Sequence, residues 1–185
     1  METAKNIVRA IAGESMARNK YTFFASQAKK EGFEQIAAIF LETADNEKEH
    51  AKRLMKLLKG ATESSLEKYD FPVVKKTVEN LKVAAAGENW EYTTMYPEFE
   101  KIARKEGQKE AAEVFKEIAE VEEKHERRYL KLLENVKKNQ VFKKNKAVYW
   151  KCRNCGYVHF GKEAPKICPA CAHPQSYYEL WCENY

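Results

Sequence analysis

The sequence predicts a mainly α-helical protein: a four-helix bundle followed by a small C-terminal domain in which four cysteines bind a metal ion. Three observations lead to this prediction. Helical periodicity dominates the first 138 residues, the two halves of this region repeat one another, and all five cysteines lie beyond residue 150. A chain of 185 residues has room for one bundle and one small metal-stabilised domain.

The helices are placed by the spacing of apolar residues and by the glycines between them. We expect four helices, over residues 4–30, 33–59, 73–105 and 108–138. Gly32, Gly60 and Gly107 stand at or near the breaks. Short loops within each pair and a longer connection around "GATESSLEKYDFP" favour a bundle with a crossover between its two helix pairs.

The second helix pair repeats the first, with one residue added. Glu88 lies 74 residues after Glu14, whereas Gly107 lies 75 residues after Gly32. The extra residue therefore entered the third helix between Glu88 and Gly107, a stretch that also contains Pro97. An inserted residue is commonly absorbed as a π-bulge, often at a functional site. A simple proline kink is the other interpretation, and both remain open.

The repeat preserves acidic residues on the apolar helix faces, where a simple bundle would have leucine. These residues are Glu14, Glu47, Glu88 and Glu122. Glu47 and Glu122 begin the units "EKEH" and "EEKH", in which His50 and His125 share a helix face with the glutamate three residues earlier. One Glu from each of two helices and one ExxH unit from each of the others is the arrangement of di-iron carboxylate bundles. The alternative is that these glutamates are ordinary solvated side chains. The match to the di-iron pattern at all six positions would then be a coincidence.

The four cysteines of the C-terminal region form two CxxC pairs separated by twelve residues: Cys152, Cys155, Cys168 and Cys171. Four thiolates at this spacing fit one tetrahedral ion. Disulfides are the alternative, but "METAKNIVRA" does not begin a secretory signal, so we expect a reducing, cytoplasmic environment. Thiolate ligands bind zinc or iron, and the spacing leaves both open. Cys182 is outside the pattern and is predicted to be a free thiol.

Charge and hydropathy limit the possible partners and the domain boundaries. The net charge of +5 comes partly from the lysines of residues 137–146, which we interpret as a solvated helix end and linker rather than a nucleic-acid site. No apolar run is long enough to span a membrane. We therefore expect a soluble protein with a bundle over residues 1–139, a linker over 140–146 and a metal domain over 147–185. His159 and His173 are expected to be surface or packing residues.

Several stretches resemble motifs of the rubrerythrin family, and the similarity runs nearly end to end. They are "AGESMARNKY", "ETADNEKEHAKRL", "GENWEYTTMYPEF", "EEKHERRYL" and "CRNCGYVHFG…CPACAHP". The resemblance implies a ferritin-like di-iron bundle with a rubredoxin-like C-terminal domain.

The resemblance also implies the ligands of three irons in each chain. Two irons are expected among Glu14, Glu47, His50, Glu88, Glu91, Glu122 and His125, with Glu47 and Glu122 bridging. The four cysteines of the CxxC pairs are expected to bind a single iron, which zinc can replace during expression. Glu91 departs from the repeat, since its counterpart is Ala17. Tyr21 and Tyr96 are expected to reach the site, most simply through hydrogen bonds to ligand carboxylates.

The predicted function follows from combining the two metal sites. Two ferrous ions supply the electrons that reduce hydrogen peroxide to water, and the four-cysteine iron returns them one at a time. We therefore expect a peroxidase that protects against oxidative stress, supplied by an external donor such as a rubredoxin or its NAD(P)H-dependent reductase. The resemblance implies a head-to-tail homodimer and an iron that shifts from Glu91 toward His50 on reduction. A ferroxidase of the ferritin type, and a non-catalytic bundle with a zinc ribbon, are the alternatives.

Overall fold

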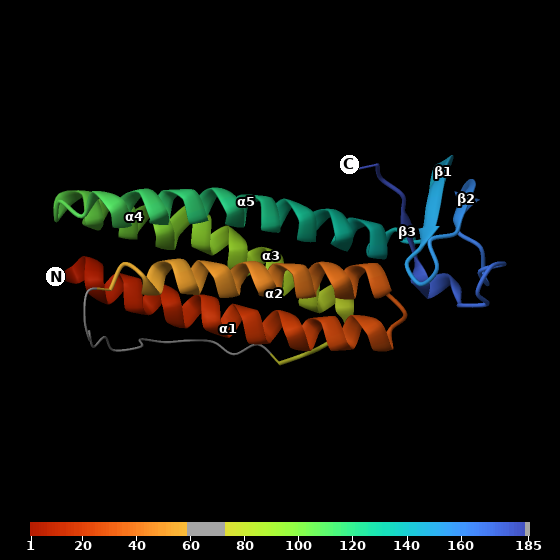
Figure 1. Ribbon diagram of the computed structural model, residues 1–185, viewed down its shortest axis with the longest axis horizontal. Coiled ribbons are helices and arrows are strands. Elements are labelled where there is room, and N and C mark those ends of the chain that lie inside the picture. The colour runs from red at the N-terminus through yellow and green to blue at the C-terminus, as the bar shows by residue number, and fades with distance from the viewer. Residues whose placement is uncertain (59–72, 184–185) are drawn as a thin grey trace.

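The computed structural model of the chain describes residues 1–58 and 73–183, and Figure 1 shows their arrangement. The bundle consists of α1 (Glu2–Lys30), α2 (Glu34–Met55), α3 (Thr77–Trp90), a π-helical turn η1 (Glu91–Met95), α4 (Tyr96–Lys105) and α5 (Lys109–Lys137). α1 packs along α2, while α3 and α4 pack along α5. The mainly helical fold and the four-helix bundle are confirmed, with α3, η1 and α4 together forming the third helix. Gly60 and the predicted crossover connection over 60–72 lie outside the described residues.

Two helix ends differ from the predicted ones by four residues, and the others agree to within two. α2 ends at Met55 rather than at residue 59, and α3 begins at Thr77 rather than at residue 73. Residues 73–76 are not helical because Asn80 holds Lys75 in another conformation: the Lys75 N–H donates to Asn80 Oδ1 at 2.9 Å, and Asn80 Nδ2 donates to the Lys75 carbonyl at 2.8 Å. The breaks at Gly32 and Gly107 are confirmed, since both adopt positive φ angles, of 77° and 71°.

The extra residue of the third helix is absorbed by a π-bulge, which decides between the two interpretations of the repeat. The Tyr96 N–H donates to the carbonyl of Glu91, five residues earlier, instead of the usual four. Pro97 is the second residue of α4 and follows this widened turn directly. The bulge therefore removes the clash that a proline ring makes with the carbonyl four residues earlier in a regular helix.

Each helix pair caps the first helix of the other pair. Glu31, at the end of α1, accepts the backbone N–H of Thr77 at the start of α3 at 2.9 Å. Its repeat equivalent Glu106, at the end of α4, accepts the N–H groups of Glu2 and Thr3 at 3.0 and 2.9 Å, and the Thr3 hydroxyl at 2.6 Å. A carboxylate at a helix N-terminus satisfies unpaired N–H groups and interacts favourably with the helix dipole. The two caps therefore fasten the ends of the bundle together.

The substitution Glu106→Gln is expected to lower the midpoint of thermal unfolding at about pH 7 by roughly 2–4 °C, as the loss of a cap does in a chain of this size. Hydrogen bonds from the Thr3 hydroxyl and from the N–H groups of Thr3 and Glu2 lower the pKa of Glu106 to about 2. A carboxyl with a lowered pKa stabilises the fold above its unfolded pKa of about 4.3, and this contribution disappears as the pH falls toward 2.

Unfolding of both proteins at a series of pH values between about 7 and 3 tests this expectation. The difference between wild type and Glu106→Gln should narrow below about pH 4.5. Glu113→Gln is the matched control, because it removes an exposed carboxylate that pairs with Arg104 at 2.9 Å without capping a helix. Equal effects of the two substitutions at neutral pH would contradict the cap.

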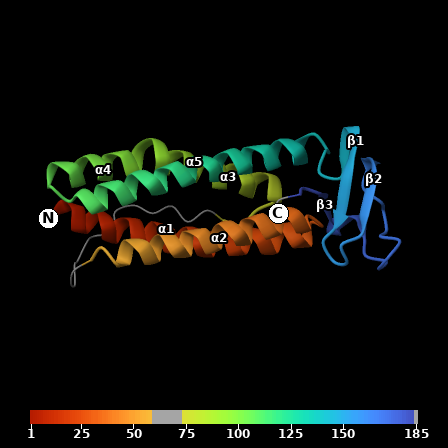
Figure 2. The same ribbon diagram turned by 45° about the horizontal axis from the view of Figure 1, so that its top comes forward.

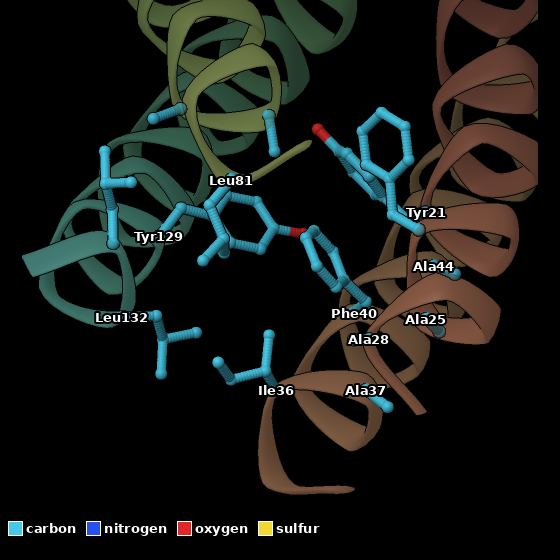
Figure 3. Close-up of a cluster of buried hydrophobic side chains, with 14 of the residues drawn as sticks. Tyr21, Ala25, Ala28, Ile36, Ala37, Phe40, Ala44, Leu81, Tyr129 and Leu132 are labelled. Carbon is cyan, nitrogen blue, oxygen red and sulfur yellow. The ribbon is translucent and has the colours of Figure 1, made fainter. Parts of the chain in front are cut away.

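Two apolar clusters fill the bundle, one on each side of its middle. The first surrounds the rings of Tyr21, Phe40 and Tyr129, and Figure 3 shows Phe40 and Tyr129 facing each other, with centroids 5.2 Å apart. The second surrounds Tyr96 and Phe115, whose centroids are 6.0 Å apart. Burial of these large rings provides much of the driving force for folding. The polar residues of the predicted site lie between the two clusters.

The C-terminal domain is a small three-stranded antiparallel sheet in the order β2-β1-β3 (Figure 2). Its strands are β1 (Lys143–Cys152), β2 (Val158–Glu163) and β3 (Tyr178–Leu180), with a 3₁₀ turn η2 (Gln175–Tyr177). Trp150, Cys152, Ala164, Cys168 and Tyr178 form its core. β1 begins at Lys143, inside the segment expected to be a linker, because Lys143 pairs with Glu163. The proposed domain boundaries remain a prediction.

This domain lies at the end of the bundle where α1 turns into α2 and α5 ends (Figure 1). The rings of Phe33 and Phe142 stack across the junction with centroids 6.3 Å apart, and Ser176 approaches Gly32 closely. No helix within residues 1–58 and 73–183 has the length and apolar character needed to cross a bilayer.

Candidate metal centres

The four helices bring six potential metal ligands together in the middle of the bundle. Glu14 comes from α1, Glu47 and His50 from α2, Glu88 from α3, and Glu122 and His125 from α5. The four glutamates and His125 are at most 4% exposed, and the side chain of His50 is 14% exposed. Each glutamate lies on the apolar face of its helix. Because that face packs toward the centre of the bundle, all four helices bring their ligands to the same place. The predicted convergence of these six residues is present.

Glu47 and Glu122 stand between the two histidines, and each offers one oxygen to each ring. Glu47 Oε2 lies 3.0 Å from His50 Nδ1, and Glu47 Oε1 lies 3.4 Å from His125 Nδ1. Glu122 Oε1 lies 3.0 Å from His50 Nδ1, and Glu122 Oε2 lies 2.6 Å from His125 Nδ1. The histidine rings are 6.1 Å apart at 26°. These two carboxylates therefore have the geometry of bridges between two adjacent cation positions.

The two positions share Glu47 and Glu122 and differ in their outer ligands. Atoms of Glu14, Glu47, His50 and Glu122 all lie within 4.8 Å of one another, as do those of Glu47, Glu88, Glu122 and His125. Two ligands that each lie about 2 Å from one ion are roughly 3 Å apart, close to several of the observed separations. The arrangement fits a dinuclear site with three carboxylates and one histidine at each position.

The hydrogen bonding of these side chains supports this fit. In the described part of the chain, six buried ligand atoms have no hydrogen-bond partner: Glu14 Oε2, Glu47 Oε1, Glu88 Oε2, both Glu122 oxygens and His125 Nδ1. His125 Nδ1 approaches Glu122 closely without the angles of a hydrogen bond, as expected for two ligands directed at one ion. Buried carboxylates are costly unless they are paired or bound to metal.

Burial and mutual repulsion make the site retain protons. Burial is the largest influence on Glu14 and raises its pKa to about 8, although the nearby His50 imidazole opposes this. Burial and the charge of Glu47 raise the pKa of Glu88 well above its usual range. Burial also acts to raise the pKa of Glu47, but the imidazoles of His125 and His50 beside it outweigh burial and lower that pKa to about 2. Cations that bind here must therefore displace protons from the acids at the two ends.

Tyr21 and Tyr96 each hydrogen-bond a glutamate from the other half of the repeat. The Tyr21 hydroxyl donates to Glu88 Oε1 at 2.5 Å, and the Tyr96 hydroxyl donates to Glu14 Oε1. Both rings are at most 1% exposed. The donated hydrogen bond leaves the second oxygen of each carboxylate free to bind a metal, so the tyrosines can fix the orientation of the outer ligands.

Glu91 lies beside the six converging residues but is outside both four-residue groups. It begins the π-helical turn η1 and is partly buried. Burial raises its pKa well above its usual range, and the strongest charge acting on it is that of Glu14, followed by Glu122 and Glu47. The charge of Glu91 also helps to raise the pKa of Glu88, so the Glu91 carboxylate lies close to the outer glutamates of both positions.

Two features of the site were not predicted from the sequence. One is a groove of about 460 Å³ between α2 and α5, which exposes the edge of His50 and is lined by Arg53, Val114 and Ile118 among others. The other is Lys20, whose ammonium lies 4.7 Å from the centroid of the Tyr21 ring. The only sequence signal for Lys20 is its position next to Tyr21, and no sequence signal indicates the groove.

The four CxxC cysteines converge in the C-terminal domain. Their sulfurs lie within 4.8 Å of one another, with Cys152 to Cys171 at 3.8 Å and Cys155 to Cys168 at 3.6 Å. Four sulfurs that each lie about 2.3 Å from one tetrahedral ion are roughly 3.8 Å apart. The His173 N–H donates to Cys171 and is the main reason that the pKa of this thiol falls to about 6. All four are free thiols, so the disulfide alternative is wrong.

The side chains of Cys182, His159 and His173 belong to neither group of converging ligands. Cys182 is an exposed free thiol, as predicted. His173 Nδ1 lies 3.1 Å from the Cys171 carbonyl, and its ring packs edge-on against Tyr177 at 4.6 Å. His159 is half-buried on β2, next to Gly161.

Known protein families match both parts of the chain. A family described as "Rubrerythrin" matches residues 5–133. A second, described as "Rubrerythrin, rubredoxin-like domain", matches residues 150–179. Together these matches cover the bundle with its six converging residues and the sheet with its four cysteines.

Individual relatives match the chain over its whole length. A rubrerythrin of Porphyromonas gingivalis is 54% identical over 100% of this chain and 92% of its own. A rubrerythrin of Nitratidesulfovibrio vulgaris is 53% identical over 99% of this chain and 96% of its own. Among solved structures, nigerythrin in its fully reduced, all-ferrous state is 32% identical with a TM-score of 0.64, covering 97% of this chain and 86% of that one.

Proposed function

The chain belongs to the rubrerythrin family, and from this premise we propose that it is a non-haem di-iron peroxidase that reduces hydrogen peroxide to water and protects against oxidative stress. The observation that supports this proposal is the presence of two kinds of metal site in one chain. A dinuclear carboxylate site can exchange two electrons, and a tetrathiolate site is suited to exchange one. In the proposed reaction the first site reduces peroxide and the second restores its electrons.

In this proposal, three irons are bound by each chain. The di-iron ligands are Glu14, Glu47, His50, Glu88, Glu91, Glu122 and His125, with Glu47 and Glu122 bridging. Cys152, Cys155, Cys168 and Cys171 hold a single iron. When bound, the ferrous pair would supply the two electrons that, together with two protons, convert hydrogen peroxide to two waters, and the thiolate iron would supply single electrons for re-reduction.

The residues around the di-iron site have separate tasks. Glu47 and Glu122 hold the two cation positions next to each other, because each carboxylate faces both histidines. Tyr21 and Tyr96 orient the outer carboxylates through their hydroxyl groups. The two apolar clusters on either side exclude bulk water, which strengthens the electrostatic interactions inside.

The reaction of the fully reduced protein with two oxidants tests this function. Hydrogen peroxide should oxidise the di-iron site much faster than dioxygen does, because the proposed substrate of the site is a peroxide, whose O–O single bond two electrons can split. Stopped-flow absorbance of the ferric pair measures both rates, and metal analysis of the same sample should give about three irons per chain. A much faster reaction with dioxygen would favour a ferroxidase instead.

We also propose that the enzyme works in the cytoplasm as a head-to-tail homodimer, with electrons from a rubredoxin or its NAD(P)H-dependent reductase. The distance between the di-iron site and the C-terminal domain of the same chain supports the dimer. His125 lies twelve residues before the end of α5, so the C-terminal domain begins about 18 Å further along the helix axis. A partner's domain can lie closer to the site than the chain's own domain does.

The iron at the Glu14 position is expected to bind Glu91 when oxidised and His50 when reduced. A ferric ion favours the anionic carboxylate, whereas a ferrous ion carries less charge and accepts the neutral imidazole readily. The placement of both side chains at this position supports the expectation, since His50 Nδ1 lies 3.6 Å from Glu14 Oε2 and Glu14 is the strongest charge acting on Glu91. Crystal structures of both redox states measure the exchange. An iron that keeps Glu91 and leaves His50 unbound after verified reduction would show that His50 only donates a hydrogen bond.

A further inference from the structure

Lys20 places a positive charge beside the acidic site, from the α1 side. Its side chain is half-buried, and its ammonium lies over the ring of Tyr21, 4.7 Å from the centroid. The same nitrogen lies 3.5 Å from the point where a Cβ would stand on Gly87 of α3. Among the described residues, no carboxylate comes within ion-pair distance of it in this structure. Lys20 therefore reaches across from α1 to α3 and lies close to carboxylates without pairing with one.

Glu91 is the carboxylate on the same face of α3 as Gly87. The Glu91 N–H donates to the Gly87 carbonyl, so the helix is regular between these two residues. Residues four apart in a helix lie on the same face, which places Glu91 one turn after Gly87. Helical side chains lean toward the N-terminus, which directs the Glu91 carboxylate back toward the turn that carries Gly87. The ammonium of Lys20 and the carboxylate of Glu91 therefore lie on one side of the site.

Both residues depart from the internal repeat. The counterpart of Glu91 in the first half is Ala17, and the counterparts of Lys20 in the second half are Thr94 or Met95, depending on the offset. Neither the extra acid nor the additional cation therefore has an equivalent in the other half of the repeat.

We propose that Lys20 is a positioning residue that receives the Glu91 carboxylate as an ion pair when Glu91 leaves the metal. This proposal rests on the expected redox shift of Glu91. A carboxylate released inside the protein has lost its hydration, and an ammonium within reach of the same helix face stabilises it there. The ion pair should form in the reduced state and break when Glu91 returns to the oxidised metal, so Lys20 favours reduction.

A double-mutant cycle on the full-length, iron-loaded protein tests the proposal, with the midpoint potential of the metal pair as its readout. The variants are Lys20→Met, Glu91→Gln and the combination of both. Lys20→Met should shift the equilibrium toward the oxidised pair by about two- to fivefold, the range of a modest ion pair. In the Glu91→Gln background the same substitution should have almost no further effect. Lys20→Arg should keep the wild-type potential.

Two further results distinguish a specific effect of Lys20 on Glu91 from the general effect of removing a positive charge. Lys29→Met removes one charge from an exposed site on the same helix, and it should leave the potential unchanged. An effect of Lys20→Met that persists in full in the Glu91→Gln background would overturn the proposal, because Lys20 would then act on the metal directly.

A structure of the reduced wild-type protein distinguishes failure of this proposal from failure of the function on which it rests. A Glu91 oxygen within about 3 Å of Lys20 Nζ is the expected result. Glu91 found away from the metal but not on Lys20 would refute the ion pair alone. Glu91 still on the metal would refute both the shift and the ion pair, while the peroxide reaction of the same sample tests the enzymatic function independently.

Discussion

A chain with zinc in the four-cysteine site and iron in the bundle is expected to react with peroxide once and then stop. The bundle iron is still ferrous before the reaction, so the first equivalent of peroxide should be consumed at the normal rate. Re-reduction should fail, because zinc has no accessible redox change and cannot pass electrons. Turnover with a rubredoxin-type reductant should fall on the order of 100-fold or more.

Two measurements on one preparation check this expectation. Single-turnover absorbance follows the first oxidation, and steady-state consumption of peroxide follows the turnover. The control is the same chain with iron in both sites. Sustained turnover by the zinc hybrid, with the rubredoxin-type protein as the only reductant, would refute the relay through Cys152, Cys155, Cys168 and Cys171.

The second large effect is expected when two inactive variants are mixed. A Cys152→Ser chain keeps its bundle and loses its relay, whereas a Glu47→Ala chain keeps its relay and loses a bridging ligand. In a head-to-tail dimer the intact bundle of one chain meets the intact relay of the other. Random mixing should therefore restore about a quarter of the wild-type peroxidase activity, since about half of the dimers are mixed and each has one working site.

A complementary mixture provides the control for this experiment. A chain with both substitutions is mixed with wild type, and native mass spectrometry shows that mixed dimers form. Transfer between chains predicts that these mixed dimers are inactive, because the intact bundle faces a defective relay. Transfer within one chain predicts the reverse in both mixtures, with mixed dimers of the two single variants inactive and those with wild type half active.

Much of the site could be predicted because its residues are fixed by spacing along single helices. Glu47 and His50 are three residues apart, as are Glu122 and His125, so each pair must share a helix face whatever the bundle does. The two CxxC pairs behave in the same way, since a CxxC turn brings its own sulfurs together. The offset of the repeat also placed an extra residue in the third helix, which the π-bulge absorbs.

The sequence by itself thus determined the four helices, the acids on their inner faces and the four converging cysteines. Only the tertiary structure decided which helix each side chain meets. Tyr21 bonds Glu88 and Tyr96 bonds Glu14, Glu106 caps α1, and Lys20 reaches Gly87. Periodicity shows which face of a helix turns inward, but contacts between helices depend on their rotation and relative height, which the packing of the whole core sets.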